Sequence, residues 1–246
     1  MNDHLDQLLA DLKLPQIRSV IDKEMKRAEK DGISYSDFLI RLFDQEHAYR
    51  RDRSLQFRIQ QAKLPELWSL ETFPFKRQPS VQQKQIRQIA ELDFIPQSTN
   101  LIFIGETGVG KTGLASAILI KALHNGYRGL FITAQNLFDQ LYESLADRST
   151  RNLVNRLMRI DVLLIDELGY LAIRPEQSHI FFKLMEERYR KKPTIITTNL
   201  DYDDWYSFLG QKKMVAALLD RVRHHCISIR IDGPSLRLPQ QQTAKP

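Results

Sequence analysis

The sequence predicts an α/β protein: a parallel β-sheet with helices on both faces, preceded by a small all-helical domain. From residue 100 onward, short runs rich in β-branched residues alternate with segments of helical periodicity, as is typical of a parallel sheet buried on both faces. Before that point, residues 1–65 place their apolar residues only at helical spacing. We therefore predict a helical N-terminal domain over 1–65, a linker over 66–79 and an α/β domain over 80–246.

The N-terminal domain is expected to contain three helices. The first, within "HLDQLLADLKL", ends before Pro15, and the second ends at Gly32, a residue type that often follows the last turn of a helix. A long third helix follows, with Ser34 or Ser36 as its N-cap and an apolar face in its first half. Its second half is basic and contains Arg50, Arg51, Arg53, Arg58 and Lys63.

The stretch "LPELWSLETFPFKRQPS" reads as a linker that packs against another part of the protein. It contains three prolines, and its aromatic side chains would be costly to leave in water. These side chains are Trp68, Phe73 and Phe75. After the linker, Ser80 and Gln83 form the pattern of a capping box, which predicts a helix through about Leu92.

The α/β domain is expected to contain five strands. They correspond to the runs "LIFIG", "RGLFIT", "DVLLIDE", "PTIITTN" and "ISIRI". Helices are expected between them over 111–124, over 135–159 and over 176–190. Because two parallel strands need a long crossover connection, which is usually a helix, this alternation favours a parallel sheet.

The composition is that of a soluble globular protein with an excess of positive charge. Apolar residues make up 42% of the chain, and no apolar run approaches the roughly 18 residues of a membrane span. The acidic N-terminus does not resemble a secretion signal, and the single cysteine, Cys226, fits a reducing compartment. We therefore expect a cytoplasmic protein without a membrane partner. The net charge of +6 is compatible with nucleic-acid binding, and the excess lies in residues 67–246.

The segment "GETGVGKT" predicts a binding site for a nucleoside triphosphate. It matches the pattern G-x-x-x-x-G-K-[ST], follows a predicted strand and opens a predicted helix. In such loops the backbone N–H groups converge on phosphate oxygens, and the helix N-terminus adds partial positive charge. Lys111 is expected to reach the β- and γ-phosphates, and Thr112 to hold Mg²⁺ through its hydroxyl. The predicted binding residues are Gly105, Glu106, Thr107, Gly108, Val109, Gly110, Lys111 and Thr112.

Two later strands end in residues suited to hydrolysis of a triphosphate. "VLLIDE" ends in two carboxylates: Asp166 is expected to complete the Mg²⁺ site, and Glu167 to activate the attacking water. "TIITTNL" ends in polar residues, and Asn199, with Thr197 and Thr198, is expected to orient that water against the γ-phosphate. The predicted catalytic residues of the subunit are therefore Lys111, Asp166, Glu167 and Asn199.

The motifs "GETGVGKT", "VLLIDE" and "TTN", in this order and spacing, resemble those of a P-loop AAA+ ATPase. The segments "FIPQSTNLIFIGETGVGKTGLASAI" and "LLIDELGYL" closely resemble the IstB-type helper ATPases of insertion sequences, which are relatives of the DnaC-type helicase loaders. The resemblance covers nearly the whole chain, including the helical N-terminus and the linker. It implies an AAA+ domain that uses ATP and Mg²⁺. It also implies a homo-oligomer, dependent on ATP and DNA, that binds duplex target DNA and recruits or stimulates a cognate transposase.

The resemblance also implies roles for residues near the C-terminus. Arg221, in "MVAALLDRVRHHC", matches the arginine finger that completes the ATP site of a neighbouring subunit, with Arg223 as the alternative candidate. Arg237 matches a second sensor arginine that reaches the γ-phosphate within the same subunit. Two residues depart from the common pattern. Glu106 replaces a proline or small residue, and Gly113 stands where IstB relatives usually carry histidine.

Two sets of basic residues are the principal candidates for DNA contacts, and a further patch consists of Lys23, Lys26, Arg27 and Lys30. The first set shares one helix face, within an arc of about 140°, and in an AAA+ ring or spiral would line the inner channel. It consists of Arg148, Arg151, Arg156 and Arg159. The second set lies in the third helix of the N-terminal domain and includes Arg50, Arg51, Arg53 and Arg58. A solvated helix face is the alternative for each set. Without a sequence-reading motif, contacts would be mostly to phosphates.

Two other functions are compatible with the same motifs. A replicative helicase loader of the DnaC type would have almost the same ATPase core, although the cysteine cluster of one loader class is missing from this sequence. An ATP-dependent structural clamp with negligible turnover would need the same nucleotide site, although the residues for hydrolysis are all present. We therefore expect an ATPase that assembles on target DNA and assists transposition.

Overall fold

The computed structural model describes residues 3–210 and 212–237, and the chain divides into two compact units. The first unit ends at Phe57 and the second begins at Arg58. This division precedes the boundary predicted at residue 65, because the last turn of the long third helix belongs to the second unit. There, Arg58 Nε donates a hydrogen bond to the carbonyl of Leu123, at 2.9 Å. Residues 238–246 of the predicted α/β domain lie outside the described residues.

The first unit consists of helices around a small apolar core. The helices are α1 (Asp3–Asp11), α2 (Pro15–Asp31) and most of α3 (Tyr35–Ala62). Gly32 ends α2 in the left-handed conformation, with φ of 61°, which confirms the predicted helix end. The buried core residues are Leu9, Ile17, Ile21 and Leu42.

Polar caps fix the starts of α2 and α3. The Ser34 hydroxyl accepts a hydrogen bond from the Asp37 N–H at 3.1 Å and donates one to the Asp37 carboxylate at 2.7 Å. Ser34, rather than Ser36, is therefore the cap of α3. At α2, the buried carboxylate of Glu46 accepts the backbone N–H groups of Gln16 and Ile17, at 2.9 and 3.1 Å. A side chain of α3 thus satisfies the first turn of α2.

The second unit is built on a five-stranded sheet in which every paired strand is parallel. The strand order is β2-β3-β4-β1-β5. The bounds are β1 Asn100–Gly105, β2 Gly129–Thr133, β3 Val162–Leu168, β4 Thr194–Thr198 and β5 Cys226–Ile231. Because β3, β4 and β1 are neighbours, the residues that follow them lie at one edge of the sheet. Ligands of open parallel sheets bind at this carboxyl edge.

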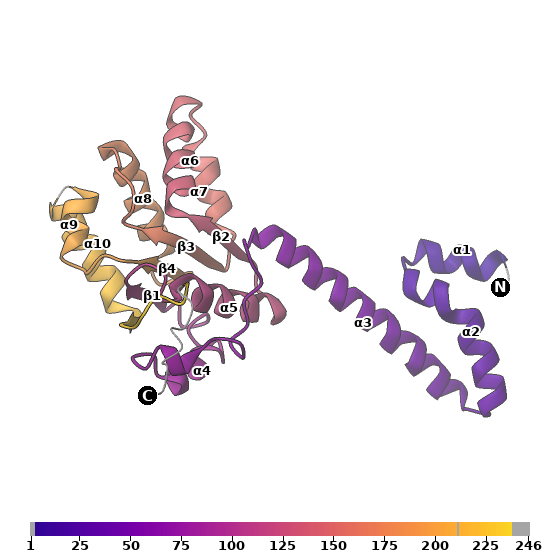
Figure 1. Ribbon diagram of the computed structural model, residues 1–246. Coiled ribbons are helices and arrows are strands. Elements are labelled where there is room, and N and C mark those ends of the chain that lie inside the picture. Colours follow the sequence, from indigo (N-terminus) through magenta and orange to yellow (C-terminus); the bar gives the residue numbers. More distant parts are fainter. Residues whose placement is uncertain (1–2, 211, 238–246) are drawn as a thin grey trace, which may run out of the picture. The chain divides into compact units, whose positions relative to one another are not determined.

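Helices cover both faces of the sheet, as the sequence predicts (Figure 1). In β1, Leu101 and Phe103 face the core that contains α4 and α5, whereas Ile102 and Ile104 face the core of α6 to α10. The bounds are η1 Phe75–Arg77, α4 Gln83–Ile89, α5 Lys111–His124, α6 Ala134–Ala146, α7 Thr150–Met158, α8 Pro175–Arg188, α9 Asp204–Leu209 and α10 Lys212–His224. Within the described ranges, no helix has the length and apolarity that crossing a membrane requires.

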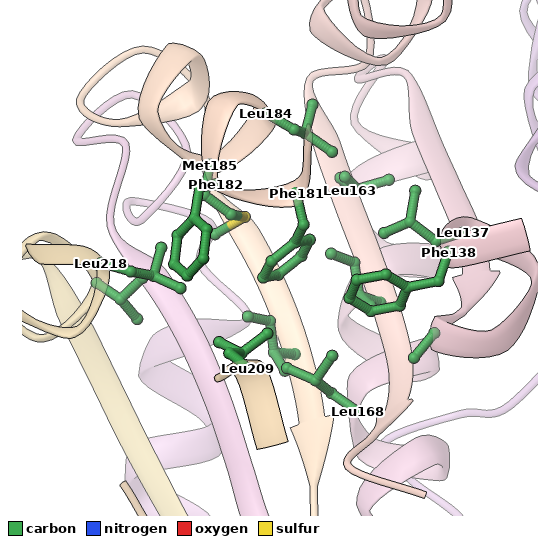
Figure 2. Packing of buried hydrophobic residues seen from close by; sticks show 14 of the residues in the cluster. Leu137, Phe138, Leu163, Leu168, Phe181, Phe182, Leu184, Met185, Leu209 and Leu218 are labelled. Carbon is green, nitrogen blue, oxygen red and sulfur yellow. The ribbon is translucent and has the colours of Figure 1, made fainter. Parts of the chain in front are cut away.

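The larger core lies between β3, β4 and the helices α6 and α8 (Figure 2). Phe138 of α6 and Phe181 of α8 are in contact, with ring centres 5.2 Å apart. Leu163 and Leu168 of β3 are fully buried in the same cluster. This packing fixes β3 from its first residues to its last, so the position of its carboxyl end is set by the core.

The prediction that Ser80 caps a helix is wrong. Helix α4 begins at Gln83, and Ser80 lies too far ahead of its first turn to cap it; no other side chain in the described part of the protein does so. The Ser80 hydroxyl instead accepts a hydrogen bond from the Asp232 N–H, at 2.8 Å. Ser80 therefore joins the end of the linker to the segment that follows β5.

Candidate functional site

The phosphate loop connects the carboxyl end of β1 to the first turn of α5. Gly108 and Gly110 have φ values of 84° and 100°, in the left-handed region that favours glycine, and Gly110 is the N-cap of α5. Among the residues that the structure describes, no side chain caps α5, so its first backbone N–H groups are not used by a capping residue. These groups, with the partial positive charge of the helix N-terminus, suit the loop to bind phosphate.

Lys111 is folded back over this loop. Its Nζ donates hydrogen bonds to the carbonyl oxygens of Gly105 and Glu106, both at 2.8 Å, and the residue is buried. Burial lowers the pKa of Lys111; Asp166 opposes this shift and Arg237 adds to it. The charges of Lys111 and Arg237 are thus close enough to influence one another.

Thr112 and Asp166 meet at the carboxyl edge of the sheet. Thr112 Oγ1 donates a hydrogen bond to Asp166 Oδ1, at 2.9 Å. Asp166 is 4% exposed, and burial raises its pKa, although hydrogen bonds from Thr197 and Thr112 oppose the shift. Hydroxyl and carboxylate oxygens are the ligand types that Mg²⁺ takes, and a cation would offset the cost of burying this carboxylate. The residues therefore fit a magnesium ion.

Glu167 follows Asp166 directly but is exposed. The pairing of β3 with β4 shifts register between Ile165 and Leu168, and Glu167 has a φ of 60°. A bulge of this kind re-aims a side chain relative to the regular alternation of a strand. The end of β3 thus presents a buried carboxylate suited to a metal and an exposed carboxylate suited to a water molecule.

The hydroxyls at the end of β4 are used within the protein. Thr197 Oγ1 donates to Asp166 Oδ1 at 2.5 Å, and Thr198 Oγ1 donates to the carbonyl of Leu168 at 2.6 Å. Both threonines are fully buried, and these hydroxyls bond to β3; their predicted role in orienting water, with Asn199, stays a prediction. Asn199 follows on the same strand end, and its Oδ1 is buried with no hydrogen-bond partner in the described ranges.

Two segments that are distant in the sequence cover the phosphate loop. The N–H of Leu236, after β5, donates a hydrogen bond to the carbonyl of Gly108, at 2.8 Å. A Cβ at Gly110 would lie 2.8 Å from the ring of Phe73 in the linker and 2.9 Å from the Leu236 side chain. With a φ of 100° and these close contacts, position 110 therefore favours glycine. No local pattern marks Phe73 or Leu236 as part of this site, so the sequence analysis did not assign them to it.

The linker aromatics pack against the sheet and helices of the second unit, to which the linker belongs, as predicted. Phe73 belongs to its buried core, and Phe75 packs against that core. Trp68 lies against Gly113, where a Cβ would be 3.1 Å from the indole ring. The residue that departs from the IstB pattern at position 113 therefore makes room for a tryptophan of the linker.

Tyr170 is a further residue at the site that the sequence analysis did not identify. Its hydroxyl lies 2.8 Å from the Thr107 hydroxyl, which joins the turn after β3 to the phosphate loop. Half of the Tyr170 surface is exposed. The available signal in the sequence was its position three residues after Glu167, in "DELGY".

The two candidate finger arginines lie at the end of α10 and make different contacts. Arg221 forms an ion pair with the exposed Glu186, at 3.3 Å, and the Arg223 guanidinium lies 5.0 Å from the ring centre of Tyr202. Within residues 3–210 and 212–237, neither hydrogen-bonds to the phosphate loop or to the carboxylates of β3. Exposed ion pairs are weak, so Arg221 can exchange Glu186 for another partner at low cost.

The basic residues predicted on one helix face are divided between a loop and a helix. Arg148 lies between α6 and α7 with a φ of 57°, so the one-helix interpretation is wrong for this residue. Arg151 and Arg156 lie on α7, and Arg159 is its C-cap. All four arginines are exposed, and Arg156 donates a hydrogen bond to Gln140 Oε1 at 2.8 Å.

The N-terminal arginines also differ in their surroundings. Arg50 pairs with Glu46 at 2.9 Å and donates a hydrogen bond to the carbonyl of Lys13 at 2.6 Å, so it joins α3 to the loop after α1. Arg51 and Arg53 are exposed on α3. The geometry therefore favours a structural role for Arg50 and leaves Arg51 and Arg53 as surface cations.

Comparison with known sequences gives matches over nearly the whole chain. The sequence model of a family described as "IstB-like ATP binding protein" matches residues 7–244. An ATP-binding protein of insertion sequence IS21 from Pseudomonas aeruginosa is 35% identical over 240 residues, which cover 98% of this chain and 91% of that protein. An ATP-binding protein of insertion sequence IS5376 from Geobacillus stearothermophilus is 34% identical over 242 residues, covering 98% and 96%.

Comparison with solved structures identifies the fold of the second unit. DnaI matches with a TM-score of 0.58 and 23% identity over 67% of this chain and 91% of that one. AMPPCP-bound DnaA from Aquifex aeolicus matches with a TM-score of 0.58 and 20% identity, over 69% and 51%. The DnaC helicase loader matches with a TM-score of 0.53 and 26% identity, over 61% and 88%.

Proposed function

This chain belongs to the family of IstB-like ATP binding proteins, and from that membership we propose that it assembles on duplex DNA under the control of ATP and recruits or stimulates a transposase. It binds ATP and is an ATPase with the P-loop AAA+ fold. Its relatives in the comparisons are ATP-binding proteins of insertion sequences.

The proposed chemistry is hydrolysis of ATP at the carboxyl edge of the sheet. The phosphates would lie on the loop of residues 105–112, with Lys111 against the β- and γ-phosphates. Mg²⁺, held by Thr112 and Asp166, would supply positive charge to the phosphates. Glu167 would take a proton from the attacking water, and Asn199 would orient that water.

The proposed oligomer is completed by arginines that act on the γ-phosphate. Arg221 of one subunit would reach the ATP of its neighbour, and its exposed pair with Glu186 is one that ATP binding can replace. Arg237 would act within its own subunit, which its electrostatic influence on Lys111 supports. Arg223 is the alternative finger, although its position over Tyr202 makes it less available.

The proposed DNA contacts are made to phosphates. Arg151, Arg156 and Arg159 are exposed at α7, and Arg148 is exposed in the loop before it. On α3, the exposed pair Arg51 and Arg53 is the second candidate. Contacts of this kind fix a protein on a duplex without reading its sequence, so target choice is expected to depend weakly on base sequence.

The main observation behind the proposal is the contact between Thr112 and Asp166, beside Glu167. It occurs in a chain that aligns over 98% of its length with an ATP-binding protein of an insertion sequence. The test is light scattering of the protein on a duplex of a few tens of base pairs, with ATP, with ADP and without nucleotide. A large complex that needs both DNA and ATP supports the proposal. A monomer under every condition contradicts it.

Glu167→Gln sharpens this test. The variant keeps the residues that bind ATP, so we expect the assembly to persist on DNA while hydrolysis falls by about 10²- to 10⁴-fold. Turnover is measured by phosphate release, and persistence by light scattering after ATP is diluted. Hydrolysis at the parental rate would show that Glu167 is not the general base.

A helicase loader is the second candidate function, because the DnaC helicase loader shares the fold at 26% identity. Purified transposase and purified replicative helicase, each offered to the assembled protein in a pull-down, separate the two candidates. Retention of the transposase alone supports the transposition helper, and retention of the helicase alone supports the loader. ATP turnover at a measurable rate excludes the structural clamp.

A further inference from the structure

Glu167 is held in a backbone conformation that residues with a side chain rarely adopt. Its φ of 60° falls in the left-handed region, and it lies at the point where β3 loses its register with β4. Such a conformation persists only where the surrounding structure holds it in place.

The contacts that hold the end of β3 come from two consecutive residues of β4. The Thr197 hydroxyl accepts a hydrogen bond from the Glu167 N–H at 2.9 Å and donates one to Asp166 Oδ1 at 2.5 Å. The Thr198 hydroxyl donates to the carbonyl of Leu168 at 2.6 Å. Three consecutive residues at the end of β3 are therefore held by two hydroxyls of the neighbouring strand.

Thr197 makes two of these contacts with a single oxygen. A hydroxyl has one proton to donate and lone pairs to accept with, so one side chain can hold a carboxylate and a backbone N–H together. Thr197 is fully buried, so no water competes for either bond. Valine has the same shape and can make neither bond, whereas serine can make both.

We propose that Thr197 is the positioning residue of the hydrolytic site: it fixes the Asp166 carboxylate that would hold Mg²⁺ and the backbone turn that aims Glu167 outward. The inference rests on the proposed roles of Asp166 and Glu167. Thr112 also donates to Asp166, but its oxygen is the one that Mg²⁺ would take, so Thr197 is the donor that remains on the carboxylate when the metal is bound. Residues behind a metal ligand set its orientation in this way.

A merely structural role for the hydroxyl predicts a different result, and β4 provides the control. Thr194 is on the same strand and fully buried, and its hydroxyl accepts a hydrogen bond from Arg188 Nε at 3.0 Å. Thr194→Val therefore also removes a buried hydroxyl, but at the opposite end of β4 from the carboxylates. If only stability matters, Thr194→Val and Thr197→Val should impair hydrolysis alike.

The experiment compares Thr197→Val, Thr197→Ser, Thr194→Val and Glu167→Gln in the full chain. It measures kcat and KM for ATP, and the affinity for a fluorescent ATP analogue with and without Mg²⁺. For Thr197→Val we expect kcat to fall about 10- to 100-fold and the effect of Mg²⁺ on analogue affinity to weaken, with metal-free affinity unchanged. Thr197→Ser should restore both quantities, and Thr194→Val should keep the parental kcat and the parental response to Mg²⁺.

The outcomes separate this inference from the proposed function. If Thr197→Val keeps the parental kcat and the parental response to Mg²⁺ while Glu167→Gln is inactive, Thr197 is not the positioning residue. The proposed function is then unaffected. Equal losses in Thr194→Val and Thr197→Val also overturn the role of Thr197. If Glu167→Gln hydrolyses ATP at the parental rate, Glu167 is not the general base, and the inference about Thr197 fails as well. If Thr197→Val does not fold, as judged by circular dichroism, Thr197→Ala is measured by the same criteria.

Discussion

The left-handed backbone conformation of Glu167 costs free energy, and comparing two substitutions at this position can measure that cost. A residue with a Cβ pays about 1–2 kcal/mol in this region, whereas glycine enters it readily. Glu167→Ala and Glu167→Gly both remove the carboxylate, so the difference between them reports the backbone strain. We expect Glu167→Gly to be more stable than Glu167→Ala by about 1 kcal/mol, measured by urea unfolding.

The sign of this difference is the informative quantity. In a helix or a regular strand, glycine is less stable than alanine, by roughly 0.5–1 kcal/mol. An alanine variant that is the more stable of the two would therefore show that Glu167 has an ordinary backbone conformation in solution.

At the scale of elements, Glu46 makes the packing of α3 on α2 dependent on pH. Burial raises the pKa of Glu46, but hydrogen bonds from Ile17, Arg50 and Gln16 outweigh it, so the pKa is lowered. The pKa in the folded state is thus below the unfolded value of about 4.3. The stabilisation is complete above that value and is lost as the pH falls through the folded pKa.

We therefore expect the amides of α2 to lose protection from hydrogen exchange on acidification from about pH 6 to pH 3 in the full chain. Glu46→Gln should be less protected at pH 6 and should lack the part of the acid dependence that Glu46 contributes. Glu29→Gln, an exposed glutamate on α2, is the matched control and should keep the parental profile. An unchanged profile in Glu46→Gln would contradict the role of this carboxylate.

Two helix caps show when the start of a helix can be predicted from neighbouring residues alone. Ser34 directly precedes the first residue of α3, and its partner Asp37 is three residues away, so the pattern and the structure agree. Ser80 shows the same spacing to Gln83, but the helix begins at Gln83 and the hydroxyl bonds to Asp232. A short cap pattern is therefore reliable only where no distant backbone group competes for the hydroxyl.

At the scale of the whole molecule, DNA affinity should depend on the arginines at α7. Arg151→Ala with Arg159→Ala should weaken duplex binding similarly for different sequences and reduce the slope of log affinity against log salt by about 2. Fluorescence anisotropy in a salt series measures both. Lys84→Ala with Arg87→Ala removes two exposed cations from α4 and is the matched control. If the two double variants lose the same amount of duplex affinity, binding depends on net charge alone and not on the position of the arginines.

The arginine finger can be tested by mixing two inactive variants. Lys111→Ala should lose ATP binding, and Arg221→Ala should bind ATP but leave its neighbour's site incomplete. In a mixed assembly, ATP on an Arg221→Ala subunit can meet the intact Arg221 of a Lys111→Ala subunit. We therefore expect ATP turnover on DNA to exceed that of either variant alone.

Arg223 provides the control for this experiment. If Arg223 is the finger, Arg223→Ala mixed with Lys111→Ala regains turnover, and Arg221→Ala alone stays active. Turnover that stays absent in both mixtures, while each variant still enters the assembly by light scattering, would contradict a site shared between subunits.

Elements that depend on only a few neighbouring residues were predictable from the sequence. A strand followed by glycines and a lysine can form only a few backbone arrangements, so residues 105–112 and the start of α5 were predictable within one segment. The five strands and the carboxylates at the end of β3 were predictable for the same reason. The family followed from these motifs, and the comparisons confirm it.

Contacts between segments that are far apart in the sequence became visible only in the folded chain. The strand order places β4 beside β3, and only this pairing turns the Thr197 hydroxyl toward Asp166 and Glu167. Likewise, Leu236 over the phosphate loop and Trp68 against Gly113 follow from packing. The physical reason is that backbone propensity acts over a few residues, whereas burial selects contacts by fit among all surfaces of the folded chain.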